Sequence, residues 1–229
     1  MSSSEDLGID HQRRAIRIIH VLRDATKKMV EPASASIVAR YGKDPFLILI
    51  ACLLSLRAKV TASLPASIRL FEYARTVKDM LALPLDTIEK LIYSVGYYRR
   101  KAATIHDVCD ALLSRFGGRV PQTEAELLSL PGVGRKTANL VLGEAFGIPA
   151  LCVDIHVHRI SNRLGLVSTR TPAETELVLQ KILPKEYWIE YNSLLVMWGQ
   201  NICVPVSPRC SVCPLAEKLC PRIGVTRSR

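Results

Sequence analysis

The sequence lacks any apolar run long enough to cross a membrane as a helix, which takes about 20 residues. Its most apolar stretch, Phe46 to Leu56, has 11 residues and predicts a buried helix. The first ten residues are Ser-rich and acidic, without the apolar core that a secretory signal needs. We therefore expect an intracellular protein, in the cytoplasm or nucleoid, or in the nucleus of a eukaryote, with no membrane partner.

Acidic residues are scarce relative to basic ones, with 21 Asp and Glu against 31 Lys and Arg. The formal charge of +10 favours a polyanionic partner, which would be nucleic acid or an anionic membrane surface. The 229 residues allow one large domain or two small ones, and the 48% hydrophobic content argues against disorder. No internal repeat or low-complexity linker interrupts the chain.

No stretch has a clear strand pattern, and helical patterns recur instead. Asp44, Thr76, Asp86 and Thr123 are expected to cap the helices that follow them. The predicted helices cover residues 12–28, 46–56, 61–73, 77–82, 87–94, 98–116, 124–129, 135–146, 154–164, 173–182 and 186–201. Because the connections between them are short, we predict an all-α fold.

The stretch from Leu130 to Ala138, Leu-Pro-Gly-Val-Gly-Arg-Lys-Thr-Ala, is the most informative part of the sequence. Gly132 and Gly134 frame Val133 between two predicted helices, so backbone N–H groups can point outward and bind a phosphate. Arg135 adds positive charge, and a phosphate contact does not depend on base sequence. An ordinary tight turn is the alternative, but the whole run matches the helix-hairpin-helix motif of DNA repair proteins.

Lys136 falls in the first turn of the second of these helices, where the positive end of the helix dipole disfavours an ammonium. An amine with a lowered pKa is a nucleophile near neutral pH, whereas a free lysine, with a pKa of about 10.4, rarely is. A lysine that only contacts phosphate is the alternative, and it is the more common case for an exposed lysine.

Asp154 stands where the next helix should begin, which predicts an N-cap. A carboxylate held by N–H groups stays ionised, so Asp154 could also stabilise positive charge on a sugar or accept a proton from an attacking amine. His156 and His158, which follow it, are expected to pack or to cap and are not assigned to catalysis.

Four of the seven cysteines crowd the C-terminal region as Cys203-x6-Cys210-x2-Cys213-x6-Cys220. Four thiolates this close in sequence suit a zinc ion or an iron–sulfur cluster, and spacing alone does not choose between them. Disulfides are the alternative, which an intracellular location disfavours. Because this segment has little regular structure of its own, a metal would hold it together and metal loss should unfold it.

The hairpin, the lysine, the aspartate and the four cysteines occur in an order that resembles the endonuclease III family. The resemblance spans about residues 30–220 and is carried by residues 130–142 (LPGVGRKTANLVL), residues 153–159 (VDIHVHR) and the cysteines. It implies two helical domains that grip DNA between them. The implied domains are a six-helix barrel with the hairpin at residues 38–148, and a domain of residues 1–37 and 149–229 that holds a 4Fe-4S cluster.

The resemblance also implies an enzyme, a DNA glycosylase and AP lyase that acts on damaged double-stranded DNA. An oxidised pyrimidine would be flipped out of the duplex, Lys136 would attack the sugar C1′ and expel the base, and Asp154 would stabilise the sugar cation. The resulting Schiff base would permit β-elimination on the 3′ side of the abasic site. The implied DNA contacts are Gly132, Val133, Gly134 and Arg135, and the implied cluster ligands are Cys203, Cys210, Cys213 and Cys220.

Three positions depart from the pattern of the family. Six residues, instead of the usual five, separate Cys213 from Cys220. Arg57 stands where many members have a Gln that fills the hole left by the flipped base. Tyr97 replaces a Leu wedge, and its ring could stack on a base. We expect Arg57 and Tyr97 to contact DNA where the lesion and the opposite base are read.

Three other interpretations compete with a bifunctional enzyme. A monofunctional mismatch glycosylase has the same hairpin, aspartate and cluster but lacks the nucleophilic lysine. A non-catalytic DNA-binding module would not need Lys136 and Asp154 together, and a zinc-held structural protein would contain no iron. We expect the protein to be a monomer.

Overall fold

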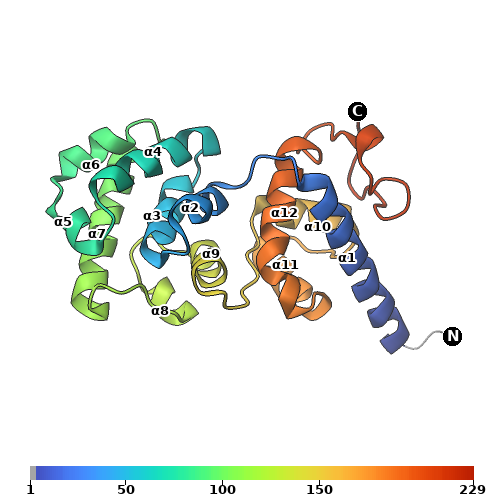
Figure 1. Ribbon diagram of the computed structural model, residues 1–229. Coiled ribbons are helices and arrows are strands. Elements are labelled where there is room, and N and C mark those ends of the chain that lie inside the picture. Colours follow the sequence, from blue (N-terminus) through green and yellow to red (C-terminus); the bar gives the residue numbers. More distant parts are fainter. Residues whose placement is uncertain (1–3) are drawn as a thin grey trace. The chain divides into compact units, whose positions relative to one another are not determined.

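The structure is a computed structural model that describes the backbone of residues 4–229 and the side chains of residues 9–229. Throughout this range the regular elements are helices, and no strand is formed, which confirms the all-α prediction. None of the helices described is both long and apolar enough to span a bilayer. The chain divides into two compact units (Figure 1), one formed by Pro32–Ile148 and the other by the residues up to Glu31 together with Pro149–Arg229.

The Pro32–Ile148 unit is built around one central helix, α3 (Pro45–Ser55), in which every residue from Phe46 to Leu54 is buried. Asp44 starts this helix, because its carboxylate accepts hydrogen bonds from the N–H groups of Phe46 and Leu47 at 2.9 and 3.0 Å. The surrounding helices are α2 (Ala33–Tyr41), α4 (Val60–Tyr73), α5 (Val77–Ala82), α6 (Leu85–Ile92), α7 (Tyr98–Phe116), α8 (Glu124–Leu128) and α9 (Arg135–Phe146). Of these, α2, α4, α7 and α9 pack directly on α3.

Three of the four side-chain caps predicted in this unit are present, at Asp44, Thr76 and Thr123. The Thr76 hydroxyl accepts from the N–H of Asp79, whose carboxylate accepts from the N–H of Thr76 in return, so the predicted cap of α5 is confirmed. The prediction that Asp86 caps a helix over 87–94 is wrong. Pro84 precedes the first residue of α6, so Asp86 lies inside the first turn and pairs with Lys90 one turn later, at 3.0 Å.

Helix α2 is an element that the sequence analysis did not anticipate. It begins after Pro32 without a side-chain cap, and it buries Ala33 and Ile37 in the unit that contains α3. The expected domain boundary at residue 38 therefore falls inside this helix, and the observed division lies just before it.

The other unit joins the start of the chain to its last 81 residues, Pro149–Arg229. It contains α1 (Ser4–Thr26), α10 (Ile155–Arg163), α11 (Pro172–Ile182), α12 (Trp188–Asn201) and two short 3-10 turns, η1 (Lys185–Tyr187) and η2 (Cys210–Val212). Helix α1, dark blue in Figure 1, packs against the orange helices α11 and α12. Their shared core includes Ile18, Leu22, Leu151, Val157, Leu179, Tyr191, Leu195 and Trp198.

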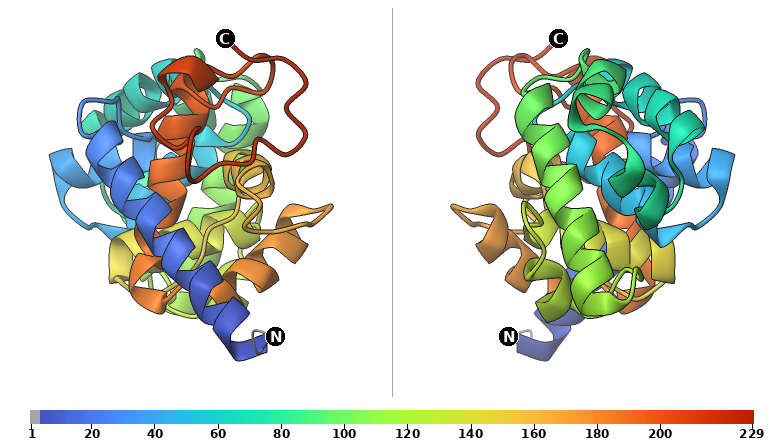
Figure 2. Two further views of the ribbon diagram at one scale, coloured as in Figure 1. Left: turned by 90° about the vertical axis from the view of Figure 1, so that its right-hand side faces the viewer. Right: turned by 90° about the vertical axis from the view of Figure 1, so that its left-hand side faces the viewer.

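The chain beyond α12 runs mainly as loops and turns, which Figure 2 shows in red. Arg14 of α1 ties this segment to the helices, because its guanidinium donates to the carbonyl oxygens of Leu164 and, at 2.9 Å, Leu219. Leu215 and Leu219 add the apolar contacts that attach the segment to the core. We call this segment, which carries Cys203, Cys210, Cys213 and Cys220, the cysteine-rich loop. It is packed as part of this unit and does not extend from it as a free tail.

Candidate functional site

The predicted hairpin connects α8 to α9. Its turn closes when the N–H of Val133 donates to the carbonyl of Leu130 at 3.2 Å, and the Val133 side chain is buried. Only the backbone of Val133 is therefore available to a partner. Gly134 is the N-cap of α9, where it supplies no side-chain acceptor, and a Cβ built on it would meet no atom within 4 Å. An anion can thus approach the start of α9 closely.

Gly132, the other glycine of the hairpin, is required for a different reason. Its φ of +70° lies in the left-handed region, and a Cβ built on it would approach Thr104 Cγ2 of α7 to 2.6 Å. The hairpin therefore rests directly on α7.

We expect Gly132→Ala to lower the free energy of unfolding by about 1–3 kcal/mol, because a strained φ is added to a steric clash. Chemical denaturation measures this loss. Gly134→Ala is the matched control, since its φ of −100° and open surroundings should make it nearly neutral. Adding Thr104→Ser, which removes Cγ2, should restore part of the loss. Equal effects of the two glycine substitutions would contradict this account.

Two basic residues begin α9. Arg135, the first, forms an ion pair with Glu124 of α8 at 3.3 Å, and both side chains are about half exposed. Lys136, the second, is exposed. Both are reachable from solvent beside the open Gly134 backbone, so the hairpin presents two cations next to the proposed anion site.

Asp154 caps α10, as the sequence predicted. Its Oδ1 accepts from the N–H groups of His156 and Val157 at 2.8 and 3.0 Å, and the residue is only 8% exposed. The segment before it is anchored by Asn192 of α12, which donates to the carbonyl of Cys152 at 3.1 Å. These two N–H groups hold one carboxylate oxygen in place at the start of α10. Asp154 and Lys136 belong to different units.

The two histidines after Asp154 lie in packed surroundings, as expected. His158 Nδ1 is 2.7 Å from the hydroxyl of Thr175 on α11. His156 lies against Gly199 of α12, where a Cβ would come within 2.4 Å of its Nδ1. These contacts fix α10 between its neighbours.

A pocket at the C-terminal end of α3 collects three of the residues predicted to contact DNA. Arg57, Tyr97 and Gly132 line it, and we call it the α3–α7 pocket. Arg57 and Tyr97 both have left-handed backbones, with φ of 52° and 61°, and the Tyr97 side chain is 71% exposed. Such conformations are costly for residues other than glycine, and they concentrate at functional sites.

The same pocket contains residues that the sequence analysis missed. Arg100, Lys101 and Thr104, all on α7, line it together with Leu53 and Leu56. The run Arg99-Arg100-Lys101 was the available signal in the sequence, but it does not reveal which of the three side chains turns toward α3.

The four C-terminal cysteines line a second pocket, together with apolar side chains that include Ile160, Leu164, Trp198 and Leu215. All seven cysteines of the chain are free thiols, so the disulfide alternative is not realised. Burial raises the pKa of Cys213 and of Cys220, and the charges of the neighbouring thiolates raise both further. Holding Cys213 and Cys220 as thiolates therefore needs a cationic partner.

The arrangement of the cysteines bears on which cation fits. Within the described residues, no three His, Cys, Asp or Glu side chains are arranged to hold one metal ion. The four thiols instead surround a common pocket. Four thiols around one pocket are a donor set that suits a zinc ion or an iron–sulfur cluster.

Helix α10 is tied directly to this cysteine-rich loop. Arg163 donates to Cys203 Sγ at 3.4 Å and to the Val204 carbonyl at 2.8 Å, while Arg159 donates to the Cys203 carbonyl at 3.0 Å. The helix that Asp154 caps at its start is thus fastened near its end to the loop that carries the cysteines.

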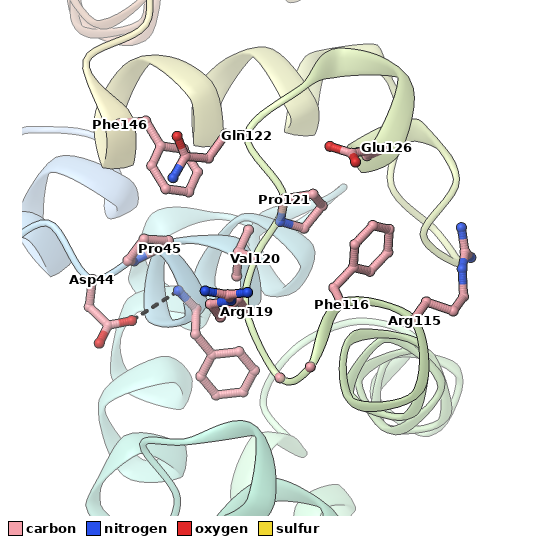
Figure 3. Close-up of a pocket in the computed structure, with 13 residues that line it drawn as sticks. Asp44, Pro45, Arg115, Phe116, Arg119, Val120, Pro121, Gln122, Glu126 and Phe146 are labelled. Carbon is pink, nitrogen blue, oxygen red and sulfur yellow. Dashed lines mark hydrogen bonds between the residues drawn. The ribbon is translucent and has the colours of Figure 1, made fainter.

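Figure 3 shows another pocket, at the opposite ends of α3, α7 and α9 from the hairpin. This pocket and the α3–α7 pocket lie at opposite ends of α3, whose 11 residues span about 16 Å. Three of the four charged side chains in the pocket of Figure 3 serve the fold: Asp44 caps α3, Arg115 donates to Ser129, and Glu126 accepts from Thr123. We therefore assign it no part in the candidate site.

Comparison with known proteins identifies the family of this chain. Residues 50–185 match the family described as "HhH-GPD superfamily base excision DNA repair protein". Endonuclease III of Thermotoga maritima is 46% identical over 190 residues, which cover 81% of this chain and 89% of that protein. The chain belongs to the endonuclease III family.

Solved structures of endonuclease III agree with this assignment. A non-covalent endonuclease III–DNA complex is similar with a TM-score of 0.79 and 36% identity, over 92% of this chain and 95% of that chain. A trapped endonuclease III–DNA covalent intermediate, an estranged-adenine complex, is similar with a TM-score of 0.75 and 38% identity, over 90% and 95%. Membership in the endonuclease III family disfavours both the non-catalytic module and the zinc-held structural protein.

Proposed function

We propose that this chain is a bifunctional DNA glycosylase and AP lyase of base excision repair. It removes oxidised pyrimidines from damaged duplex DNA and cuts the strand on the 3′ side of the abasic site. The observation that carries the proposal is an exposed Lys136 at the start of α9, beside the open hairpin, in a member of the endonuclease III family. The substrate places the activity inside the cell, where the DNA is, and we expect a monomer to perform it.

The chemistry assigns one role to each of two residues. The neutral amine of Lys136 attacks C1′ of the damaged nucleotide, the N-glycosidic bond breaks, and the base leaves with the bonding electrons and takes up a proton. The Asp154 carboxylate stabilises positive charge at C1′ and accepts a proton from the attacking nitrogen. The C1′–O4′ bond then opens: the nitrogen lone pair forms the C1′=N bond of a protonated imine, and O4′ takes up a proton. This imine acidifies C2′, so loss of a C2′ proton expels the 3′ phosphate by β-elimination.

DNA binding uses two parts of the Pro32–Ile148 unit, the hairpin and the α3–α7 pocket. The backbone at Gly134, with Arg135, binds a phosphate without regard to base sequence. The α3–α7 pocket, with Arg57 and Tyr97, reads the bases around the lesion. In this proposal the Pro32–Ile148 unit corresponds to the six-helix barrel domain, and the unit that includes Pro149–Arg229 corresponds to the cluster domain.

The ligands that we propose for a 4Fe-4S cluster are Cys203, Cys210, Cys213 and Cys220. Four thiols around one pocket, in a member of the endonuclease III family, support a cluster. When bound, the cluster supplies a cross-link among four points of a loop that has little regular structure.

Duplex DNA with one thymine glycol, incubated with the protein and borohydride, tests the function. A covalent protein–DNA complex is expected, because borohydride reduces an imine to a stable amine. Asp154→Asn should keep the fold, since Asn is an equally good N-cap, yet lower base release by about 10²–10⁴-fold. Base release that depends on Asp154 without any trapped complex would instead establish a monofunctional enzyme. Neither release nor trapping, with DNA still bound, would refute the proposal for this lesion.

A further inference from the structure

The backbone carbonyls at the end of α3 find their partners in two ways. Groups close in sequence serve three of them: Ser55 Oγ donates to Cys52 at 2.8 Å, the Leu56 N–H to Leu53 at 3.3 Å, and the Ala58 N–H to Ser55 at 3.1 Å. The carbonyls of Leu54 and Leu56 are served from another helix instead.

That donor is Lys101 of α7. Its ammonium nitrogen lies 2.6 Å from the carbonyl oxygen of Leu54 and 2.7 Å from that of Leu56. A cation at the C-terminal end of a helix is favoured by the helix dipole, and charge-assisted hydrogen bonds are the strong ones. The contact therefore fixes the turn that contains Arg57, the residue immediately after Leu56.

Lys101 also shares the α3–α7 pocket with Tyr97 and Thr104. Lys101 and Thr104 are three residues apart on α7, which places them on one side of the helix, and Tyr97 immediately precedes its first residue. Thr104 supports Gly132 of the hairpin. The first turns of α7 thus hold the end of α3 and support the hairpin, beside Tyr97 in the same pocket.

We infer that Lys101 is a positioning residue for lesion recognition, whose two hydrogen bonds to α3 hold the following turn so that Arg57 faces the DNA. Arg57 keeps a left-handed backbone at this turn, which a residue with a side chain adopts only where its surroundings impose it. We call the two hydrogen bonds from Lys101 the clamp. Without the clamp, the turn can relax to an ordinary conformation, and the Arg57 side chain no longer points toward the DNA. The inference rests on the proposed function, because it assigns Arg57 a place against DNA.

The protonation of Lys101 offers a readout that a purely structural role would not affect. Burial lowers the pKa of Lys101 to about 8. The charged or titratable groups that share its pocket are Arg57, Arg100 and Tyr97. The ammonium is present below pH 8 and is lost above it, so the contribution of Lys101 to DNA binding should be full below that pH and should decline as pH rises through it.

The first test compares Lys101→Met with Arg99→Met, which removes an equal charge from an exposed position two residues earlier on α7 and outside the pocket. Lys101→Met should raise KM for a thymine glycol duplex about ten-fold, the size of one lost charge-assisted hydrogen bond, with kcat nearly unchanged. Lys101→Arg should recover part of the loss, and the gap between wild type and Lys101→Met should narrow above pH 8. Equal effects of Lys101→Met and Arg99→Met would overturn the inference.

A double-mutant cycle tests whether Lys101 acts through Arg57. Arg57→Ala should raise KM by a similar factor, and the double variant should be no worse than either single one, because both changes remove the same interaction. Additive losses would mean that Lys101 acts independently of Arg57, and the inference would fail.

Trypsin cleavage after Arg57 tests the clamp without DNA. Lys101→Met should be cut at Arg57 several times faster than wild type, while Arg99→Met should be cut at the wild-type rate. Circular dichroism identifies any variant that has unfolded, and Lys101→Arg then takes its place with a smaller expected increase. Cleavage at an unchanged rate in a folded variant would refute the clamp. A wild type without glycosylase activity would refute the proposed function and would leave this result standing.

Discussion

Lys136→Gln is expected to abolish borohydride trapping and to lower strand cleavage at an abasic site by about 10³-fold or more. The amide of glutamine cannot form an imine, so covalent catalysis is lost while the length of the side chain is nearly kept. Lys136 is exposed at the second position of α9, so the substitution should leave the fold intact. Denaturing gels measure the trapped complex, and a binding assay under the same conditions measures affinity.

Lys78→Gln is the matched control for this prediction. Lys78 is also exposed and is also the second residue of a helix, α5, in the same unit. It should leave trapping and cleavage unchanged. Trapping that survives in Lys136→Gln would show that another amine is the nucleophile, and a large loss of affinity in the same variant would show that Lys136 mainly contacts phosphate.

Cys213→Ala is expected to remove the iron of the protein together with its visible absorbance, and to lower the melting temperature by about 10 °C or more. A bound metal group contributes to folding free energy, and the loop after α12 has few helical hydrogen bonds to replace it. Arg159 and Arg163 fasten α10 to this loop, so the loss should spread to the helix that Asp154 caps. Base release should therefore fall as well.

Cys109→Ala is the control for the loss of a thiol. Cys109 is fully buried on α7, where burial raises its pKa to about 12, and it lies outside the cysteine-rich loop. Its substitution should lower stability by about 1 kcal/mol and leave the iron content unchanged. One zinc and no iron in the wild type would contradict the proposed cluster, and an unchanged iron content in Cys213→Ala would contradict the proposed ligand.

Sequence reasoning succeeded where the decisive interactions are local. Asp44, Thr76 and Asp154 each cap the predicted helix, because a cap depends on N–H groups two or three residues away. Asp86 failed for an equally local reason, since Pro84 starts the helix earlier. Helix α2 was missed because it begins after Pro32 without a polar cap.

The α3–α7 pocket could not be predicted in the same way. Arg57 and Tyr97 were singled out through a family resemblance, but Lys101 becomes informative only when α7 lies against the end of α3. Lys101 and Arg57 are 44 positions apart, and nothing in the sequence near either residue specifies that Lys101 contacts the end of α3. Gly132 is a similar case, because its contact with Thr104 appears only after the hairpin has packed on α7.

The two ends of the chain share one core, and this has a consequence for synthesis on the ribosome. The Pro32–Ile148 unit is continuous, so it can complete its core while later residues are still being added. Ile18 and Leu22 of α1 are synthesised before the Pro32–Ile148 unit, whereas Leu179 and Leu195 of the same core are synthesised after it. The apolar side of α1 must therefore wait, exposed to chaperones and proteases, until α12 leaves the exit tunnel. The unit that carries Lys136 can therefore fold before the unit that carries Asp154.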